Sequence, residues 1–299
     1  MAKAKWGESQ IPNQKGKLVI VTGSTSGIGK EAVRILTDKQ ATLVMSVRNT
    51  QKGDLVAAEI QSANPEAKIK VMQLDLSSLE SIKDFAANFN QYFDRLDVLI
   101  NNAGIMMCPH AKTTDGFEIQ MGTNHLGHFA LTGYLLPLLK KTKNSRIVVT
   151  SSVAHKFGKI NLDDINWEKR KYNTNNAYGD SKIANLYFAY ELVRKLKSDP
   201  HAPMVTAAHP GWTRTELQRH KSGIRFLNNF FSQAPEMGIL PSLRAGFDPE
   251  AKAGDYYGPA KYFEMQGHPV IVKSNQLSHD RDIAKQLWDI SEEMTGVKY

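Results

Sequence analysis

The chain has 299 residues, 41% of them hydrophobic and 23% charged, which excludes a disordered or fibrous protein and is typical of a globular domain with a substantial core. Its formal net charge of +8 is compatible with anionic partners such as a phosphorylated cofactor, but the basic residues are scattered, so we expect no nucleic-acid binding. With one cysteine, Cys108, and no apolar stretch of the ~20 residues that a membrane helix needs, the sequence predicts a soluble cytoplasmic protein with no membrane anchor.

The predicted elements alternate along the chain. The first 15 residues are polar and predict an N-terminal arm outside the core. Short runs of apolar and β-branched residues predict strands at 17–22, 41–47, 68–74, 97–101, 146–151 and 204–208. Longer stretches between and after them predict helices at 27–39, 51–63, 78–92 (with Ser77 as N-cap), 116–142, 177–197 and 280–295.

This alternation predicts an α/β fold with a doubly wound parallel sheet and three layers, α/β/α, in one domain over residues 1–299. Two segments interrupt it. Residues 157–176 are a polar insertion before the helix expected from 177, and residues 212–254 form the expected substrate-loop region. Within the latter, the segment 219–254 predicts a substrate lid, an oligomer contact or a helix covering the core, because it contains Phe226, Leu227, Phe230, Phe231, Met237 and Leu240.

A loop of small residues joins the first predicted strand to the first predicted helix. Small residues let the backbone approach a pyrophosphate, whose charge is then met by N–H groups at the start of the helix. A simple turn would also use such glycines, but the position directly after a strand near the start of the chain predicts a dinucleotide site. The expected contacts are Gly23, Ser24, Thr25, Ser26, Gly27, Ile28 and Gly29.

The end of the second predicted strand bears on the choice between NAD and NADP. Enzymes that use NAD usually place Asp or Glu there, ~20 residues after the loop, to bind the ribose 2′-hydroxyl. Here the strand ends at Val47-Arg48, and the nearest downstream acid is Asp54. Because a guanidinium suits a 2′-phosphate, we predict NADP(H) with Arg48 as the phosphate ligand.

Tyr178 and Lys182 are four residues apart at the start of a predicted helix and are therefore neighbours on one face. Hydride transfer to a carbonyl leaves an oxygen that needs a proton, and the reverse reaction needs a base. A tyrosine with the usual pKa of about 10 is a poor base at neutral pH, but a lysine ammonium and an oxidised nicotinamide would lower that pKa. Ser152 can hold the substrate oxygen; Ser151 is the adjacent alternative, and either can be a turn residue.

Several motifs, taken together, resemble the short-chain dehydrogenase/reductase family: Thr22-Gly23-x-x-x-Gly27-Ile28-Gly29, Asn101-Asn102-Ala103-Gly104, Ser152, Tyr178-x-x-x-Lys182 and Pro210-Gly211. The resemblance implies a Rossmann fold and an NADP(H)-dependent alcohol dehydrogenase or carbonyl reductase. It implies four catalytic residues, with Asn124 holding a proton-relay water: Asn124, Ser152, Tyr178 and Lys182. The cofactor contacts that it adds to the loop and Arg48 are Asp75, Leu76, Asn102, Ala103, Gly104, Tyr178, Lys182, Pro210, Gly211 and Thr213.

Three further stretches are similar to the retinol dehydrogenase-like branch: residues 124–129, 151–155 and 209–211. A small apolar carbonyl or alcohol is the expected substrate, and Met106, Met107, His155, Phe157 and Trp212 are expected to line its site. We expect no metal, because His125, His128 and His155 have no second ligand cluster beside them. Two other functions stay open, reduction of a carbon–carbon double bond and non-catalytic NADPH sensing, and the protein is expected to be a monomer or a homodimer.

Overall fold

The computed structural model describes residues 5–213 and 232–299. Within them the strands form one sheet in the order β3-β2-β1-β4-β5-β6-β7-β8. Their bounds are β1 Leu18–Thr22, β2 Thr42–Val47, β3 Lys68–Gln73, β4 Val98–Asn101, β5 Arg146–Thr150, β6 Met204–Ala208, β7 Tyr256–Lys261 and β8 Gln266–Ile271. All neighbouring strands are parallel except β7 and β8. The predicted doubly wound α/β fold is confirmed, with an antiparallel strand added at one edge.

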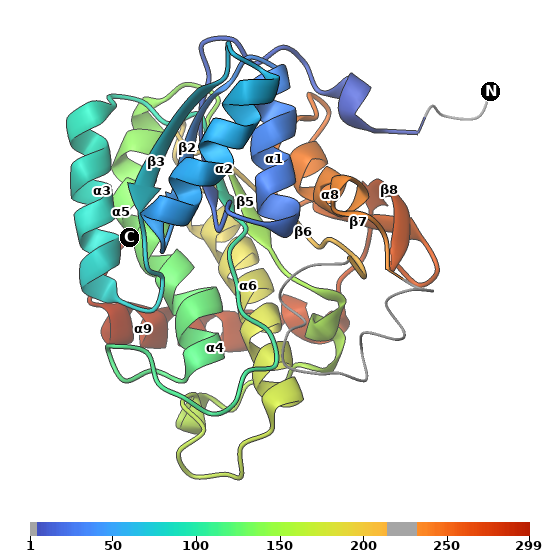
Figure 1. Cartoon of the computed structure of the whole chain (residues 1–299). Coiled ribbons are helices and arrows are strands. Elements are labelled where there is room, and N and C mark those ends of the chain that lie inside the picture. The colour runs from blue at the N-terminus through green and yellow to red at the C-terminus, as the bar shows by residue number, and fades with distance from the viewer. Residues whose placement is uncertain (1–4, 214–231) are drawn as a thin grey trace.

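Helices cover both faces of the sheet (Figure 1). One face holds α1 (Gly27–Asp38), α2 (Thr50–Ala63) and α8 (Pro235–Phe247), and the other holds α3 (Leu79–Tyr92), α5 (Gly127–Lys141) and α6 (Thr174–Lys195). In β1, Leu18 and Ile20 belong to the core on the second face, and Val19 and Val21 to the core on the first. Successive strand residues point to opposite faces, so a strand buried on both sides is apolar throughout.

The C-terminal helix α9 (Arg281–Thr295) lies outside α6 and packs against it (Figure 1). Trp288 of α9 contacts the rings of Phe129 in α5 and Phe188 in α6, with centroids 5.1 and 5.9 Å apart. As a result α6 is covered on all sides, and every residue from Ala177 to Tyr190 is buried. None of the helices within the described ranges has the length and apolar character needed to span a membrane.

The N-terminal segment differs from the arm that the sequence predicts. Trp6 and Ile11 are only 8% and 3% exposed and belong to the same core cluster as α1 and α8. The carbonyl of Trp6 also bonds to His268 of β8, 2.9 Å away. The prediction was wrong for residues 5–15 because two isolated apolar side chains in a polar stretch show no periodicity.

Other boundaries and elements also differ. Ser78, not Ser77, is the N-cap of α3, since its Oγ accepts from the Ser81 N–H at 3.2 Å. The helix expected over 116–142 consists of α4 (Ile119–Met121), a π-helical turn, η2 (Gly122–Leu126), and α5. The helix expected from 177 begins at Thr174 with Asn173 as its cap. Strands β7 and β8 were not predicted.

The region 212–254 contains a buried helix rather than a lid in its described part. Helix α8 places Leu240 in the core and packs Met237 against it, which confirms the alternative of a helix covering the core for this stretch. Phe226, Leu227, Phe230 and Phe231 lie outside the described residues. The expectations of a lid and of an oligomer contact therefore stay predictions for residues 214–231.

The insertion 157–176 packs tightly on the rest of the molecule. Arg170 stacks on Trp167, 3.5 Å from the ring centroid, and pairs with Asp164 and with Asp180 of α6. Its end also contacts the loop after β4, where the Thr174 hydroxyl donates to the Cys108 carbonyl at 2.8 Å. The insertion thus connects helix α6, which carries Tyr178 and Lys182, to the loop after β4.

Candidate functional site

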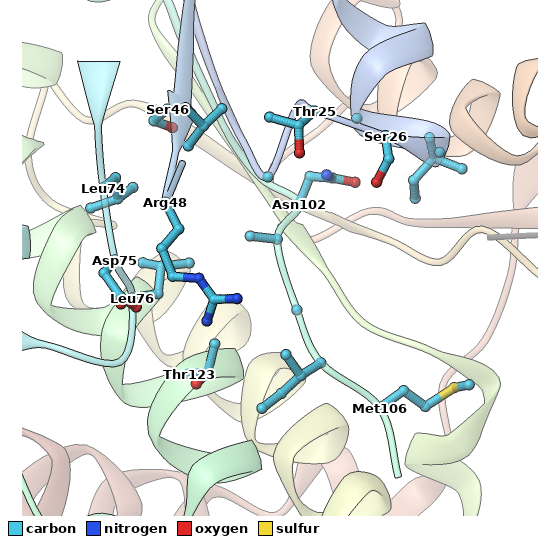
Figure 2. Close-up of a pocket in the computed structure, with 18 of the residues that line it drawn as sticks. Thr25, Ser26, Ser46, Arg48, Leu74, Asp75, Leu76, Asn102, Met106 and Thr123 are labelled. Carbon is cyan, nitrogen blue, oxygen red and sulfur yellow. The ribbon is translucent and has the colours of Figure 1, made fainter. Parts of the chain in front are cut away.

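A cavity of about 390 Å³ opens at the carboxyl ends of β1, β2, β3 and β4. This is the edge at which open parallel sheets bind ligands. Figure 2 shows Thr25, Ser26 and Asn102 on one side of it and Asp75, Leu76 and Thr123 on the other. The predicted cofactor residues that line it are Gly23, Thr25, Ser26, Gly27, Ile28, Gly29, Arg48, Asp75, Leu76, Asn102, Ala103 and Gly104. Twelve separate predictions are thus brought together in one cavity.

The glycine loop is built for a close backbone approach. Gly23 and Gly27 have φ values of 68° and 54°, which glycine adopts without steric cost. A methyl group on Gly29 would clash with the Gly23 carbonyl oxygen and lie 2.8 Å from Asn102 Nδ2. These glycines therefore let the first turn of α1 pack directly on the wall made by Asn102, with its N–H groups at the cavity.

Arg48 projects from the end of β2 into the cavity (Figure 2). Its side chain is exposed, and among the described residues it has no carboxylate partner. Asp75, across the cavity, has one carboxylate oxygen occupied by the N–H and hydroxyl of Ser77, at 2.9 and 2.6 Å. The guanidinium is therefore available for an anionic ligand.

Asn124 connects the cavity wall to α6. Its side-chain amide accepts from the Ile105 N–H at 2.8 Å and donates to the Ile105 carbonyl at 2.9 Å, and also bonds Ser181 of α6. A Cβ on Gly104 would lie 3.0 Å from Asn124 Oδ1 and 3.4 Å from Lys182 Nζ. Gly104 lines the cavity, so the Lys182 ammonium and the Asn124 amide lie directly beside its wall.

Tyr178 and Lys182 are both buried, and the Lys182 Nζ lies 5.7 Å from the centre of the Tyr178 ring. Burial raises the pKa of Tyr178 to about 12, and a hydrogen bond with Ser152 opposes the rise. Burial also lowers the pKa of Lys182 to about 8. The sequence led us to expect a lowered tyrosine pKa; in the protein alone desolvation is larger than any effect of the lysine, so the phenol is favoured.

Ser152 and Ser151 have different partners. Ser151 donates its hydroxyl to the Lys182 carbonyl at 2.7 Å and so holds α6 against β5. Ser152 is half-buried, interacts with Tyr178 and caps the short helix η3 (Val153–Phe157), its Oγ accepting from the Ala154 N–H. Of the two, only Ser152 has a hydroxyl directed to the tyrosine. His155 is fully buried, with Nδ1 2.6 Å from the Ser152 carbonyl, so its predicted place in the substrate wall was wrong.

The predicted residues after β6 lie on the far side of this centre and do not line the cavity. Gly211 has a φ of 65°, and its neighbour Trp212 donates to the Met265 carbonyl at 2.9 Å. Thr213 donates to the carbonyl of Pro210 at 2.8 Å. The turn between β7 and β8, which the sequence did not predict, thus holds residues 211–212 after β6.

Several residues that line the cavity were not predicted, notably Ser46, Leu74, Ile105 and Thr123. Thr123 immediately precedes Asn124 in the π-helical turn, a type of turn that often marks functional sites. No motif includes it, and only its position next to Asn124 could have indicated it. Met106 and Cys108 also line the cavity, as expected of Met106.

Orphaned polar atoms show that the cavity suits a polar ligand. Asn102 Oδ1 and Thr123 Oγ1 are buried in its wall and have no hydrogen-bond partner within residues 5–213 and 232–299, and the same holds for the hydroxyl of Ser24 beside it. Buried polar groups are normally paired, because leaving one unpaired costs roughly 1–3 kcal/mol. With the glycine loop and Arg48, these atoms fit a phosphorylated dinucleotide.

The histidines near the site are bonded within the protein. His125 contacts Ser291 of α9 at 2.9 Å, and His128 contacts Thr22 and the Asn124 carbonyl, each at 3.0 Å. Across residues 5–213 and 232–299, no three His, Cys, Asp or Glu side chains lie close enough together to hold a metal ion. These histidines therefore act in the structure as hydrogen-bonding groups.

Comparison with known proteins gives one consistent result. A family model for short chain dehydrogenases matches residues 17–223. Retinol dehydrogenase 11 of Homo sapiens is 40% identical over 293 residues, covering 96% of this chain and 87% of the relative, and retinol dehydrogenase 13 of the same species is 39% identical over 292 residues, covering 95% and 86%. The crystal structure of an uncharacterised protein from Mycobacterium paratuberculosis is similar with 37% identity, 99% coverage of both chains and a TM-score of 0.84.

Proposed function

Because the chain belongs to the short-chain dehydrogenase family, we propose that it transfers a hydride between NADP(H) and the carbonyl or alcohol carbon of an apolar substrate. The observation that supports this most directly is the contact between two halves of one site. A cavity with a glycine loop and an arginine that is unpaired among the described residues adjoins a group of four polar side chains, of which Ser152 is half-buried and the others are buried: Asn124, Ser152, Tyr178 and Lys182.

The cofactor residues divide by the part of the ligand that they would hold. The N–H groups at the start of α1 suit the pyrophosphate, and Arg48 suits a 2′-phosphate. Asp75, Leu76 and Thr123 would hold the adenine side, and Gly104, Lys182 and the loop 210–213 the nicotinamide side. NADP(H), when bound, supplies or receives the hydride.

Tyr178 would exchange a proton with the substrate oxygen. With a pKa raised to about 12 by burial, it is a phenol at neutral pH and is ready to donate in the reductive direction. Ser152, which interacts with the same hydroxyl, would hold the substrate oxygen in place. In the oxidative direction Tyr178 must act as a base, and the positive charge of Lys182 would favour its phenolate.

An apolar substrate is supported by the cavity end and by the relatives. Met106 and Cys108 line the end of the cavity near Gly104, and Met107 adjoins them. The relatives reported above are named for retinol, an apolar alcohol. We propose a substrate of this type, an apolar alcohol or the corresponding aldehyde or ketone.

The direct test is loss of NADPH absorbance with a panel of apolar aldehydes, ketones and enones, and with NADH in parallel. We expect turnover with aldehydes or ketones and a preference for NADPH. Turnover of enones alone would indicate a carbon–carbon double-bond reductase. NADPH binding without turnover of any compound would favour a sensor and contradict the proposed chemistry.

Lys182 gives a prediction about stability. Its pKa falls from 10.5 to about 8 in the folded protein, and a shift of this size corresponds to about 3 kcal/mol. The folded state disfavours the protonated lysine, so the cost is complete below pH 8 and disappears as the pH rises towards 10.5. We therefore expect Lys182→Met to stabilise the cofactor-free protein at pH 7 while impairing turnover, in denaturant unfolding at several pH values.

The pH dependence separates this effect from ordinary packing. The stability gained by the variant should shrink between pH 8 and pH 10.5. Lys141→Met, at an exposed lysine of α5, is the matched control and should change little at any pH. A Lys182→Met protein no more stable than the wild type at pH 7 would mean that the ammonium is well solvated before the cofactor binds.

A further inference from the structure

His128 lies behind the cavity, on the first turn of α5, and is 2% exposed. Its Nε2 is 3.0 Å from the Thr22 hydroxyl, at the end of β1. Its Nδ1 is 3.0 Å from the backbone carbonyl oxygen of Asn124. The imidazole therefore joins the strand that leads into the glycine loop to the helix turn that presents Asn124.

The chemistry of the partners fixes the proton on the ring. A carbonyl oxygen only accepts, so Nδ1 carries the hydrogen and donates to Asn124. Burial lowers the pKa of His128 to about 4, which keeps the ring neutral and leaves Nε2 as an acceptor for the Thr22 hydroxyl. One donor and one acceptor are both used, and the two bonds point in opposite directions from the ring.

The Thr22 hydroxyl also holds the part of the cavity wall formed by Asn102 and Ala103. It accepts from the backbone N–H groups of Asn102 at 2.9 Å and Ala103 at 2.8 Å. Its own hydrogen has two acceptors in reach, His128 Nε2 at 3.0 Å and the more distant Ile100 carbonyl at 3.4 Å, and the shorter contact is the better hydrogen bond. The packing between these segments is tight, since a methyl group on Gly23 would lie 2.8 Å from the Ala103 side chain. A small shift of Thr22 would therefore move residues that line the cofactor cavity.

We propose that His128 is a positioning residue that sets the cofactor cavity through Thr22 and the proton-transfer site through the Asn124 carbonyl. Only the part of this inference that concerns the proton-transfer site rests on the proposed function. His128 is not in the cavity wall and would not touch the cofactor or the substrate. Its effect would be transmitted through two separate hydrogen bonds, and these can be removed one at a time.

Replacing His128 by asparagine or by glutamine introduces a side-chain amide that keeps only one of its two hydrogen bonds. The amide nitrogen of His128→Asn occupies the place of Nδ1 and keeps the donor to Asn124, whereas the amide of His128→Gln reaches the place of Nε2 and keeps a partner for Thr22. We expect the asparagine variant to bind NADPH about tenfold more weakly with kcat nearly unchanged. We expect the glutamine variant to bind NADPH normally with kcat lowered about tenfold.

His125 provides the matched control. It is also buried, lies three residues earlier and bonds Ser291 of α9 instead of the cavity wall. His125→Asn and His125→Gln should lower the melting temperature without separating kcat from NADPH affinity. Thr22→Val and Thr22→Ser test the other end of the link, and only the valine variant should weaken NADPH binding.

The experiment measures NADPH dissociation constants by fluorescence, kcat at saturating NADPH, and melting temperatures for all variants. Equal changes of affinity and kcat in the two His128 variants, or no change in either, would overturn the inference. So would unchanged NADPH binding in Thr22→Val, a substitution that keeps the shape of the side chain. Absence of turnover in the wild type would instead contradict the proposed function. NADPH affinities of the variants would still test whether His128 sets the cofactor cavity through Thr22.

Discussion

Replacing Tyr178 by phenylalanine is expected to lower kcat by a factor of about 10² to 10⁴, the usual contribution of a positioned acid or base. The substitution removes one oxygen and leaves the buried ring that packs in α6. The hydroxyl that is lost is the one that interacts with Ser152. NADPH affinity should change little, because Arg48 and the glycine loop are untouched. Steady-state turnover and a fluorescence titration measure the two quantities separately.

Tyr190→Phe is the matched control for this experiment. It lies three helical turns further along α6, is also buried, and its hydroxyl is 3.0 Å from Ser274 at the other end of the helix. We expect its kcat to stay close to that of the wild type. If Tyr178→Phe kept wild-type turnover, the proposed acid–base mechanism would be wrong, and loss of activity in both variants would indicate a packing effect on α6.

Arg48→Asp is expected to weaken NADPH binding at least about 10- to 100-fold, with a much smaller effect on NADH. A hydrogen bond to a charged group contributes about 1.5–3 kcal/mol, and the introduced carboxylate would add repulsion. The prediction depends on the free state of Arg48, which is exposed at the cavity and unpaired among the described residues. Titrations with NADPH and NADH measure the ratio of the two dissociation constants in the variant and in the wild type.

Lys30→Gln controls for the loss of a cation near the cavity. Lys30 lies on the first turns of α1 and is paired with Glu59 at 2.6 Å, and it does not line the cavity. We expect it to shift both cofactors slightly and equally. Equal losses of NADPH and NADH affinity in Arg48→Asp would mean that Arg48 has no part in recognising a 2′-phosphate.

The central sheet could be predicted because its strands are short, apolar and buried on both faces. β7 and β8 escaped prediction since their sequences contain Gly258, Pro259, Gly267 and Pro269, which disfavour strands unless tertiary contacts support them. Helix α8 was only one of three alternatives for residues 219–254, because Pro241 within it disfavours a helix. The burial of Trp6 depends on helices far along the chain, and no local pattern in the first 15 residues encodes it.

For the site, sequence spacing is informative about position: the glycine loop lines the cavity, and Lys182 lies beside Tyr178. The chemical roles of these residues stay predictions. Sequence reasoning failed where a role depends on which way a side chain points. Thr123 lines the cavity, whereas His155, placed in the substrate wall, is wholly buried. The link from His128 to Thr22 spans 106 residues of sequence and becomes visible only in the folded chain.

The enclosure of α6 by α9 has a consequence for how the molecule moves. A helix whose residues from Ala177 to Tyr190 are all buried cannot open locally, so its backbone amides should exchange with solvent only when the whole domain unfolds. Any local fluctuation that admits a substrate would then have to occur outside this helix. Tyr178 would thus be held on a rigid helix, and its position relative to a bound cofactor would not depend on local opening of the chain around it.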